Sequence, residues 1–242
     1  MGQKSEENLW KAGVHTWTDF IQRELVPGIN PARKPLFDIQ LREAEKQLFA
    51  GNSEYFTVLP SNEQWRAWEE FGEEAAYIDI ETNHQNNITV LGISDGVRTW
   101  QFVRHHNMNQ EDIREVLKQF KLLVTFNGAC FDLPIIRRYF THVLPDVPHI
   151  DLRFVGQKIG LRGGLKHIEK SIGISRGENV EDVRGSDALI LWSQYRRTGN
   201  TQFRDILLEY NAEDILNLKP LAEYMYAKIK AEKTKYIKTS TV

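Results

Sequence analysis

The chain has 242 residues and a formal net charge of −2, with 41% hydrophobic and 26% charged residues. This composition is ordinary for a globular protein, and the near-neutral charge excludes a globally basic surface, so any nucleic-acid partner must be held by a local patch. Cys130 is the only cysteine, no apolar run approaches the roughly 20 residues that cross a bilayer, and residues 1–7 lack the apolar core of a signal peptide. We therefore expect a cytoplasmic protein without intrachain disulfides that does not associate with membranes.

The first part of the chain, residues 1–72, has the pattern of helices and loops. Apolar side chains recur at helical spacing over residues 9–21, with an interruption near Gly13. Residues 2–14 (GQKSEENLWKAGV) resemble half of a helix-hairpin-helix element, a module that often holds a DNA backbone. The alternative is a helical cap on the domain that follows. Because the partner half is missing and the surroundings are acidic, the cap is favoured.

Two further helices are expected before residue 72. Prolines at positions 27, 31 and 35 indicate a loop, after which a helix is expected from Asp38 to Ala50, with Gly51 as its stop signal. Another helix is expected to start at Ser61, where Gln64 three residues later completes a capping box. Together these signals predict a helical extension over residues 1–72.

Short strands replace helices from Ala75 onward. Strand patterns occur at residues 75–80, 88–94 and 97–103, and the tight turn Asp95-Gly96 joins the last two. A helix (111–120), a buried strand (122–126) and mostly helix to about residue 230 follow. Three strands followed by alternating helix and strand predict an α/β domain with a mixed sheet. We assign residues 73–235 to this domain and residues 236–242 to a C-terminal tail.

Four acidic residues in three separate blocks are placed so that they can meet. Asp79 and Glu81 are two apart on a predicted strand, so both leave the same face of the sheet. Asp132 follows a glycine-containing turn after the strand at 122–126, and strand ends that open into loops are common ligand sites in α/β proteins. Tyr210 and Asp214 are four apart on a predicted helix and share one face.

The chemistry of these residues indicates a metal site. Two carboxylates in an apolar strand would repel each other and lose hydration unless a cation compensates them, and Mg²⁺ prefers carboxylate oxygen. A single Asp-x-Glu among 33 acidic residues means little, and a lone Tyr-x-x-x-Asp is more often a helix-surface pair. The combined pattern is much more specific. It predicts a cage for two divalent ions and two-metal hydrolysis of nucleic acid.

The ordered motifs Asp-x-Glu, Asn-x-x-x-Phe-Asp and Tyr-x-x-x-Asp resemble the DEDD exonucleases of the ribonuclease H-like superfamily, tyrosine subclass (DEDDy). Residues 164–173 (GLKHIEKSIG) and 188–197 (ALILWSQYRR) are closer still to its YprB-like branch of predicted exonucleases. The resemblance covers residues 75 to about 230. It implies a ribonuclease H-like mixed sheet, an antiparallel three-strand meander plus parallel strands, flanked by helices. It also implies 3′→5′ hydrolysis of DNA or RNA with a free 3′ end, releasing nucleoside 5′-monophosphates with two Mg²⁺ or Mn²⁺ ions.

The resemblance also implies a role for each motif residue. Asp79, Glu81 and Asp214 would ligate one ion, and Asp79 would bridge to a second, with Asp132 near it directly or through water. Tyr210 would orient the attacking water. Because the unperturbed pKa of tyrosine is about 10, Tyr210 is expected to stay protonated and act through a hydrogen bond.

Three more residues are candidate substrate contacts, each with a structural alternative. Thr82 would offer its hydroxyl or N–H to the terminal nucleotide, or would simply end the strand. Here the chain has Asn83-His84 where the family often has Gly-Leu, which affects how the last base is held. Asn127 would contact substrate or cap its own turn. Lys166 would reach a phosphate at a helix start or belong to a solvated basic face.

Asp151 and Cys130 are expected to be structural. Asp151 is predicted to cap the helix that follows it, and Cys130, which lacks a histidine partner in sequence, is predicted to be a small buried residue. Two other functions remain open. One is a nucleic-acid-binding module of a larger repair or defence assembly that does not cut, and the other is a structure-selective endonuclease of the same fold.

Overall fold

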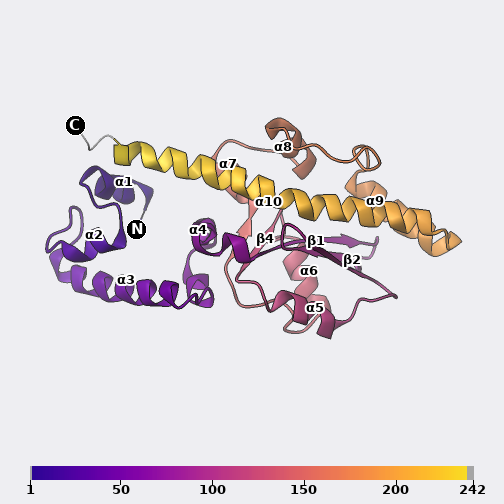
Figure 1. The fold of residues 1–242 in the computed structure, drawn as a ribbon, viewed down its shortest axis with the longest axis horizontal. Helices are drawn as coiled ribbons and strands as arrows, with labels where there is room; N and C mark the ends of the chain where they lie inside the picture. Colours follow the sequence, from indigo (N-terminus) through magenta and orange to yellow (C-terminus); the bar gives the residue numbers. More distant parts are fainter. Residues whose placement is uncertain (1, 239–242) are drawn as a thin grey trace.

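The computed structural model describes residues 2–238 and contains one mixed five-stranded sheet flanked by helices (Figure 1). The strand order is β3-β2-β1-β4-β5, with antiparallel pairing along β3-β2-β1 and parallel pairing along β1-β4-β5. The predicted α/β class and mixed sheet are therefore confirmed. The strands are β1 (Ala75–Thr82), β2 (Ile88–Ser94), β3 (Thr99–Val103), β4 (Leu122–Thr125) and β5 (His149–Asp151).

The antiparallel half of the sheet forms the predicted meander. Its second hairpin closes at the predicted turn, where Gly96 adopts the left-handed conformation and the Asp95 carboxylate accepts the N–H groups of Val97 and Arg98. Strand β5, by contrast, was not expected from the sequence. It has only three residues, which is too short to show an alternation pattern.

Helices cover both faces of the sheet, as Figure 1 shows. On one face, α5 (Gln110–Leu117) and α6 (Asp132–Tyr139) pack over alternate strand residues, forming a core that includes Ile78, Leu91, Ile113 and Ile136. The other face is covered by the long helix α10 (Thr201–Lys238) together with α7 (Leu152–Lys158) and α8 (Leu165–Ile172). Each fully buried isoleucine or leucine contributes about 1.5–3 kcal/mol, so both layers are needed to stabilise the fold.

Helix α10 connects the sheet to the N-terminal helices. Its 38 residues correspond to a length of roughly 57 Å at 1.5 Å per residue. Helix α9 (Gly185–Thr198) packs against α10 near the sheet, and α1 (Gln3–Lys11) packs against α10 near its other end. At that contact Glu6 pairs with Arg66 at 2.9 Å and with Lys233 at 3.3 Å.

The N-terminal part is helical, as predicted. It contains α1, α2 (Trp17–Gln22), α3 (Lys34–Phe49) and α4 (Trp68–Phe71), with 3-10 helices η1 (Pro31–Arg33), η2 (Glu54–Val58), η3 (Ser61–Ala67) and η4 (Gly72–Glu74). Helix α3 begins four residues earlier than expected. Its proline lies in the first turn, where no backbone N–H is needed for the helix. The division into an extension and a nuclease domain remains a proposal.

The capping box predicted at Ser61 is wrong. The segment is a 3-10 helix with Pro60 at its N-cap, and no side chain caps it. Gln64 instead donates to the carbonyls of Thr57 and Leu59 and accepts the N–H of His149 at 2.8 Å, so it ties the extension to β5. The Gln64 side chain therefore bonds to groups in other segments and does not form the local cap that its spacing from Ser61 suggests.

The C-terminal end of the chain is helical as far as Lys238. The predicted tail, residues 236–242, therefore begins inside α10, and residues 239–242 lie outside the described residues. Within residues 2–238, no helix has the length and apolar character needed to cross a membrane.

Candidate metal centre

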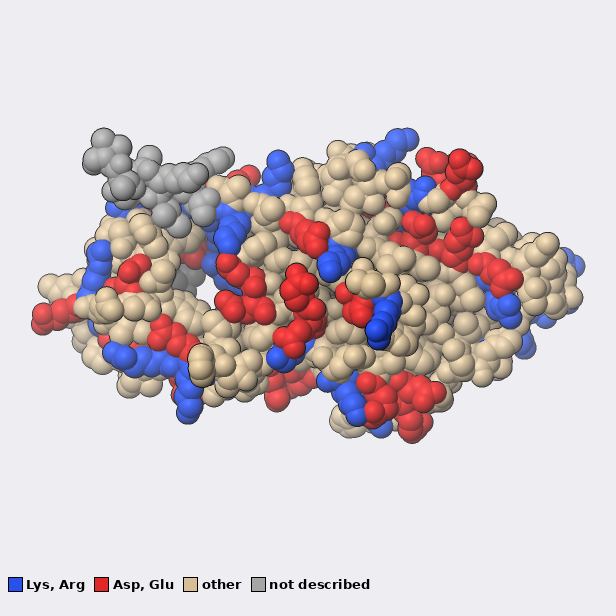
Figure 2. Space-filling view, in the orientation of Figure 1, with Lys and Arg blue, Asp and Glu red and all other residues tan. Residues whose placement is uncertain are grey.

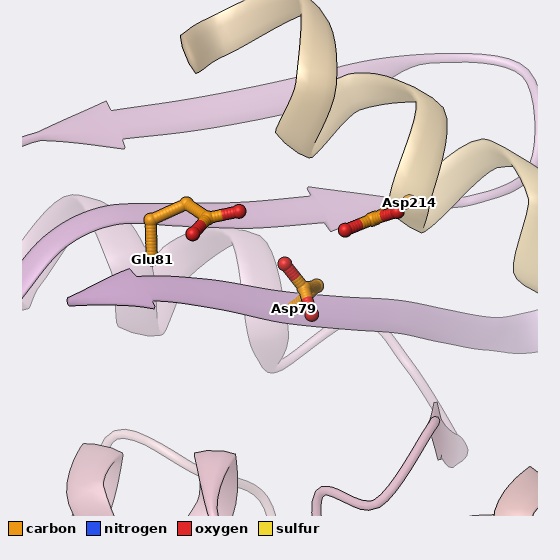
Figure 3. A group of neighbouring side chains, drawn as sticks. All are labelled: Asp79, Glu81 and Asp214. Atoms are coloured by element: carbon orange, nitrogen blue, oxygen red, sulfur yellow. The ribbon is translucent and has the colours of Figure 1, made fainter. Parts of the chain in front are cut away.

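Three carboxylates from distant parts of the chain converge over the sheet. Asp79 and Glu81 leave the same face of β1, and Asp214 approaches them from α10, as Figure 3 shows. One oxygen from each lies within 4.8 Å of the others. Glu81 and Asp214 are only 8% and 6% exposed, whereas Asp79 is half-buried. The predicted convergence is therefore present for these three residues.

The electrostatics of this group favour a bound cation. Burial raises the pKa of Asp79 and of Glu81 well above their ordinary values, and the charges of Asp214 and Asp132 raise them further. Burial also raises the pKa of Asp214, although Arg176 opposes that shift. Packing these carboxylates together is unfavourable while all are ionised, and a divalent cation relieves the repulsion.

Asp132 lies beside this group but is not one of the three convergent residues. It starts α6, and its Oδ1 accepts the backbone N–H of Ile80 at 3.0 Å. The parallel pairing of β1 with β4 covers only Ala75–Tyr77, so the N–H of Ile80 needs another acceptor. Burial raises the pKa of Asp132 to about 7, although the hydrogen bond from Ile80 opposes the shift.

An asparagine orients Asp79. The Nδ2 of Asn211 donates to Asp79 Oδ2 at 3.0 Å, while Gln101 donates to Asn211 Oδ1 at 3.0 Å, which sets the direction of the amide. Gly92 lies opposite Asp79 in the strand register, and a Cβ there would fall 2.2 Å from Asn211 Oδ1. A glycine is therefore required for this close approach. Sequence analysis missed both residues, although Asn211 lies inside the Tyr210–Asp214 motif and Gly92 interrupts an otherwise apolar strand.

A buried arginine supplies positive charge on the other side of Asp214. Arg176 Nη1 lies 2.5 Å from Asp214 Oδ1, while its Nε and Nη2 donate to Glu169 at 2.7 and 2.8 Å. The side chains of Arg176 and Glu169 are only 4% and 2% exposed. Burial acts to lower the pKa of Arg176, but the two carboxylates outweigh it and raise that pKa, so the guanidinium stays charged. Sequence analysis missed this pair, since nothing local marks it as buried.

The residues of this site lie within a region that matches a known protein family. The family RNase_H_2, described as RNase_H superfamily, matches residues 76–226, which is more than half of the chain and includes all four acidic candidates. The chain belongs to the RNase H superfamily. No curated protein and no solved structure matches it. Membership of the RNase H superfamily implies nuclease-type chemistry on nucleic acid that depends on divalent metal ions.

The tyrosine of this RNase H superfamily site lies one helical turn before Asp214. The side chain of Tyr210 is largely buried, and its hydrogen bond to Asp214 acts to lower the pKa of that carboxyl group. Burial, then the charges of Asp214 and Glu81, raise the pKa of Tyr210 above its ordinary value. The phenol therefore stays protonated at neutral pH, as expected, and can act as a hydrogen-bond donor.

Lys166 does not point its amine at the carboxylates. Its Nζ donates to the carbonyls of Val180 at 2.8 Å and Glu181 at 3.1 Å, and also to the carbonyl of Val183. These three acceptors use all three ammonium donors. Lys166 thereby fixes the connection between α8 and α9 and is half-buried, so it does not belong to a solvated basic face. Its predicted contact with a phosphate stays a prediction. Its Nζ also lies 5.1 Å from the centre of the Tyr210 ring.

The loop after β4 is organised by Asp151. As predicted, Asp151 caps α7 by accepting the N–H of Arg153 at 3.0 Å, and it also accepts the N–H groups of Asn127 and Ala129. The side chain of Asn127 accepts from Arg153 at 2.6 Å and does not cap its own turn, a role taken by Thr125 Oγ1. Asn127 therefore remains a candidate for substrate contact, but its side-chain oxygen must first lose the hydrogen bond from Arg153.

Two other predicted residues have different outcomes. Thr82 ends β1 in a buried position, directly after the irregularity in the β1–β2 register, so it lies next to Glu81 at the edge of the group. Cys130 is exposed and not buried as expected, because it lies in the turn between β4 and α6 and not in the core.

The residues present fit a hard divalent cation. The convergent ligand atoms are all carboxylate oxygens, the donors that Mg²⁺ and Mn²⁺ prefer. Burial is the largest cause that raises the pKa values of Asp79 and Glu81, and the charges of neighbouring carboxylates come next. Arg176 therefore compensates Asp214 and leaves the two strand carboxylates to be neutralised by an ion.

Proposed function

We propose that this chain is a metal-dependent 3′→5′ exonuclease that hydrolyses phosphodiester bonds at nucleic-acid 3′ ends by a two-metal mechanism and releases nucleoside 5′-monophosphates. The observation that carries the proposal is the convergence of Asp79, Glu81 and Asp214, with Tyr210 on the Asp214 side of the same helix. The motif order of the tyrosine-subclass DEDD exonucleases and the RNase H superfamily match support it.

Each residue has a defined part in this proposal. Asp79, Glu81 and Asp214 would hold one Mg²⁺ or Mn²⁺ ion, and Asp79 would help to hold a second, with Asp132 near it directly or through water. When bound, such ions stabilise negative charge on the phosphate and favour deprotonation of water. Tyr210 keeps its proton and orients the attacking water through its hydroxyl, while Asn211 keeps the Asp79 carboxylate in one rotamer.

Substrate contacts are proposed on the same edge of the sheet. Thr82 offers its hydroxyl or N–H to the terminal nucleotide, since it directly follows Glu81 at the end of β1. Asn127 is at φ +67° in the loop before α6, and its amide becomes available to a nucleotide when Arg153 turns to a phosphate.

One observation favours a different function. Arg176 pairs with Asp214 and so provides, from within the chain, positive charge that a metal would otherwise supply. That is the arrangement expected of a nucleic-acid-binding module that does not cut. Against it, burial and neighbouring carboxylates raise the pKa values of Asp79 and Glu81 well above their ordinary values, and a module without metal would gain stability by losing these two residues.

Digestion of end-labelled oligonucleotides distinguishes these functions. DNA and RNA labelled at the 5′ end should give a ladder shortened from the 3′ end with Mg²⁺ or Mn²⁺, and EDTA or Asp79→Asn should abolish it. A matched control is Asp146→Asn, an exposed aspartate in the connection between α6 and β5, which should cut normally. Equal activity of wild type and Asp79→Asn would refute the mechanism, and cleavage of closed circular DNA would instead indicate an endonuclease.

A further inference from the structure

A basic groove begins where β1 ends. It encloses about 490 Å³. Three arginines and two histidines line it, and no aspartate or glutamate of the described chain does; the lining residues are Asn83, His84, Gln85, Arg104, His105, Leu189, Trp192, Ser193, Arg196 and Arg197. In a chain with a net charge of −2, this is a local concentration of positive charge. It is the kind of patch that a near-neutral protein needs to hold a polyanion.

The groove adjoins the carboxylates. Asn83 on its wall comes two residues after Glu81, a distance of roughly 7 Å along an extended chain. The opposite wall is α9, which contacts both β1 and α10, the two elements that carry the carboxylates. Figure 1 places α9 at the same end of the sheet. A chain that leaves the carboxylate site past Thr82 therefore enters this groove.

The basic groups of the groove are partly held in position before any ligand binds. Arg104 donates from Nη1 to the Tyr139 hydroxyl at 2.8 Å, with its guanidinium 5.7 Å from the centre of that ring. Arg196 and Arg197 lie exposed in the last turn of α9. The pKa of His105 is lowered by desolvation and then by the charges of Arg196 and Arg104, so both arginines act on the same point in the groove.

The surroundings differ in charge from the groove. On the face drawn in Figure 2, acidic and basic side chains are interspersed, and acidic ones gather over α5, whose first turn contains Glu111 and Asp112. A phosphate backbone is repelled there. Trp192 lines the groove but is buried, so the site offers charge for a backbone more than a platform for base stacking.

We propose that this groove binds the sugar-phosphate backbone of a single nucleic-acid strand, 5′ of the nucleotide held at the carboxylates. The proposal rests on the function proposed above. Arg196 and Arg197 contact phosphates of the incoming strand from α9, and Arg104 contacts them from the end of β3. Positive charge in an open groove is the common means of holding single strands without reading their sequence.

Binding of a fluorescent single-stranded 12-mer tests the groove directly. Anisotropy is measured in EDTA, which prevents cutting, over a range of NaCl concentrations. For Arg196→Gln/Arg197→Gln we expect about tenfold weaker binding and a salt slope smaller by about 1.4, from about 0.7 per lost phosphate contact on a single strand. The matched control, Arg42→Gln/Lys46→Gln, removes the same charge from exposed positions of α3 and should bind like wild type. Unchanged binding by the groove variant, or equal loss in the control, overturns the proposal.

A second substrate separates failure of the groove from failure of the exonuclease proposal. The p-nitrophenyl ester of thymidine 5′-monophosphate needs only the carboxylate site, so the groove variant should hydrolyse it at the wild-type rate while its KM for the 12-mer rises about tenfold. If wild type cuts neither substrate but the groove variant still loses binding, the groove proposal stands and the exonuclease proposal fails. If wild type cuts both and the variant has the same KM, the groove proposal fails alone. A duplex that competes as well as the single strand overturns the assignment to single strands.

Discussion

The buried arginine beside Asp214 allows a sharp prediction about stability. Arg176→Met keeps the length of the side chain and removes its charge, which leaves the buried Glu169 and Asp214 without their ion-pair partner. Removing one partner of a buried ion pair typically costs about 3–5 kcal/mol, because the remaining charge cannot be hydrated. Two carboxylates lose the same partner here, so we expect the free energy of unfolding in EDTA at pH 7 to fall by about 3–5 kcal/mol. Small domains have only about 5–15 kcal/mol in total.

Urea unfolding followed by tryptophan fluorescence measures this loss. The double variant Glu169→Leu/Arg176→Met removes the second charge as well, so it should lose less stability than Arg176→Met alone. Arg162→Met, at an exposed position before α8, is the matched control and should stay within about 0.5 kcal/mol of wild type.

Divalent metal provides an independent check on the cause. Because a cation at the carboxylates neutralises Asp214, saturating Mg²⁺ should stabilise Arg176→Met by more than it stabilises wild type. A ligand at 100 times its Kd adds about 2.7 kcal/mol, which is large enough to measure. A loss below about 1 kcal/mol for Arg176→Met in EDTA, or equal stabilisation of both proteins by Mg²⁺, would refute the view that Arg176 compensates buried charge.

Three further predictions concern the groups around the carboxylates. Gly92→Ala places a Cβ 2.2 Å from Asn211 Oδ1, so the free energy of unfolding measured in urea should fall by about 1–3 kcal/mol. An unchanged free energy of unfolding would show that the Asn211 side chain is not held against Gly92. Tyr210→Phe should lower the rate of 3′-end digestion substantially while calorimetric Mg²⁺ affinity stays near wild type, and a matched loss of affinity would give the hydroxyl a metal-binding role instead. Burial raises the pKa of Asp132 from 3.8 to about 7, so between these pH values the folded state binds more protons than the unfolded state. The free energy of unfolding in EDTA should therefore fall as pH rises through this interval. Asp132→Asn should flatten this dependence, and a free energy of unfolding that rises with pH would contradict the burial argument.

The sheet and the convergence of three carboxylates were predictable because they depend on short periodicities. Side chains two apart on a strand share a face, which places Asp79 with Glu81, and side chains four apart on a helix share a face, which places Tyr210 with Asp214. The strands at 75–82 and 88–94 are long and apolar, so their type is unambiguous. That the strand pair and the helix residue meet at one point was inferred from the elements on which the three blocks lie and from the metal that such carboxylates need, and the family resemblance agrees with it.

The residues that were missed or given another role act through tertiary contacts that local spacing does not reveal. Arg176 and Glu169 have the composition of an exposed surface pair, and only the packing of α8 on α10 buries them. Lys166 has the pattern of a phosphate-binding residue at a helix start, but the carbonyls of the following connection capture its amine. Gln64 fits a capping box and instead bonds across to β5. In each case the sequence spacing suggests one role for a polar side chain, and the tertiary structure gives that side chain different hydrogen-bond partners.

The electrostatics of the site suggest why a strand carries two of its carboxylates and a helix the third. Asp79 accepts a hydrogen bond from Asn211, and Glu81 lies two residues further along the same face of β1, so the strand keeps the two carboxylates close together. Asp214 pairs with Arg176, and it lies on α10, which also contacts α8 and α9. A cation that binds the strand pair must therefore compete with Arg176 for Asp214 or share that carboxylate with it. Metal affinity in this protein is then set by the arginine as well as by the ligands, and Arg176 variants should shift it without altering any ligand atom.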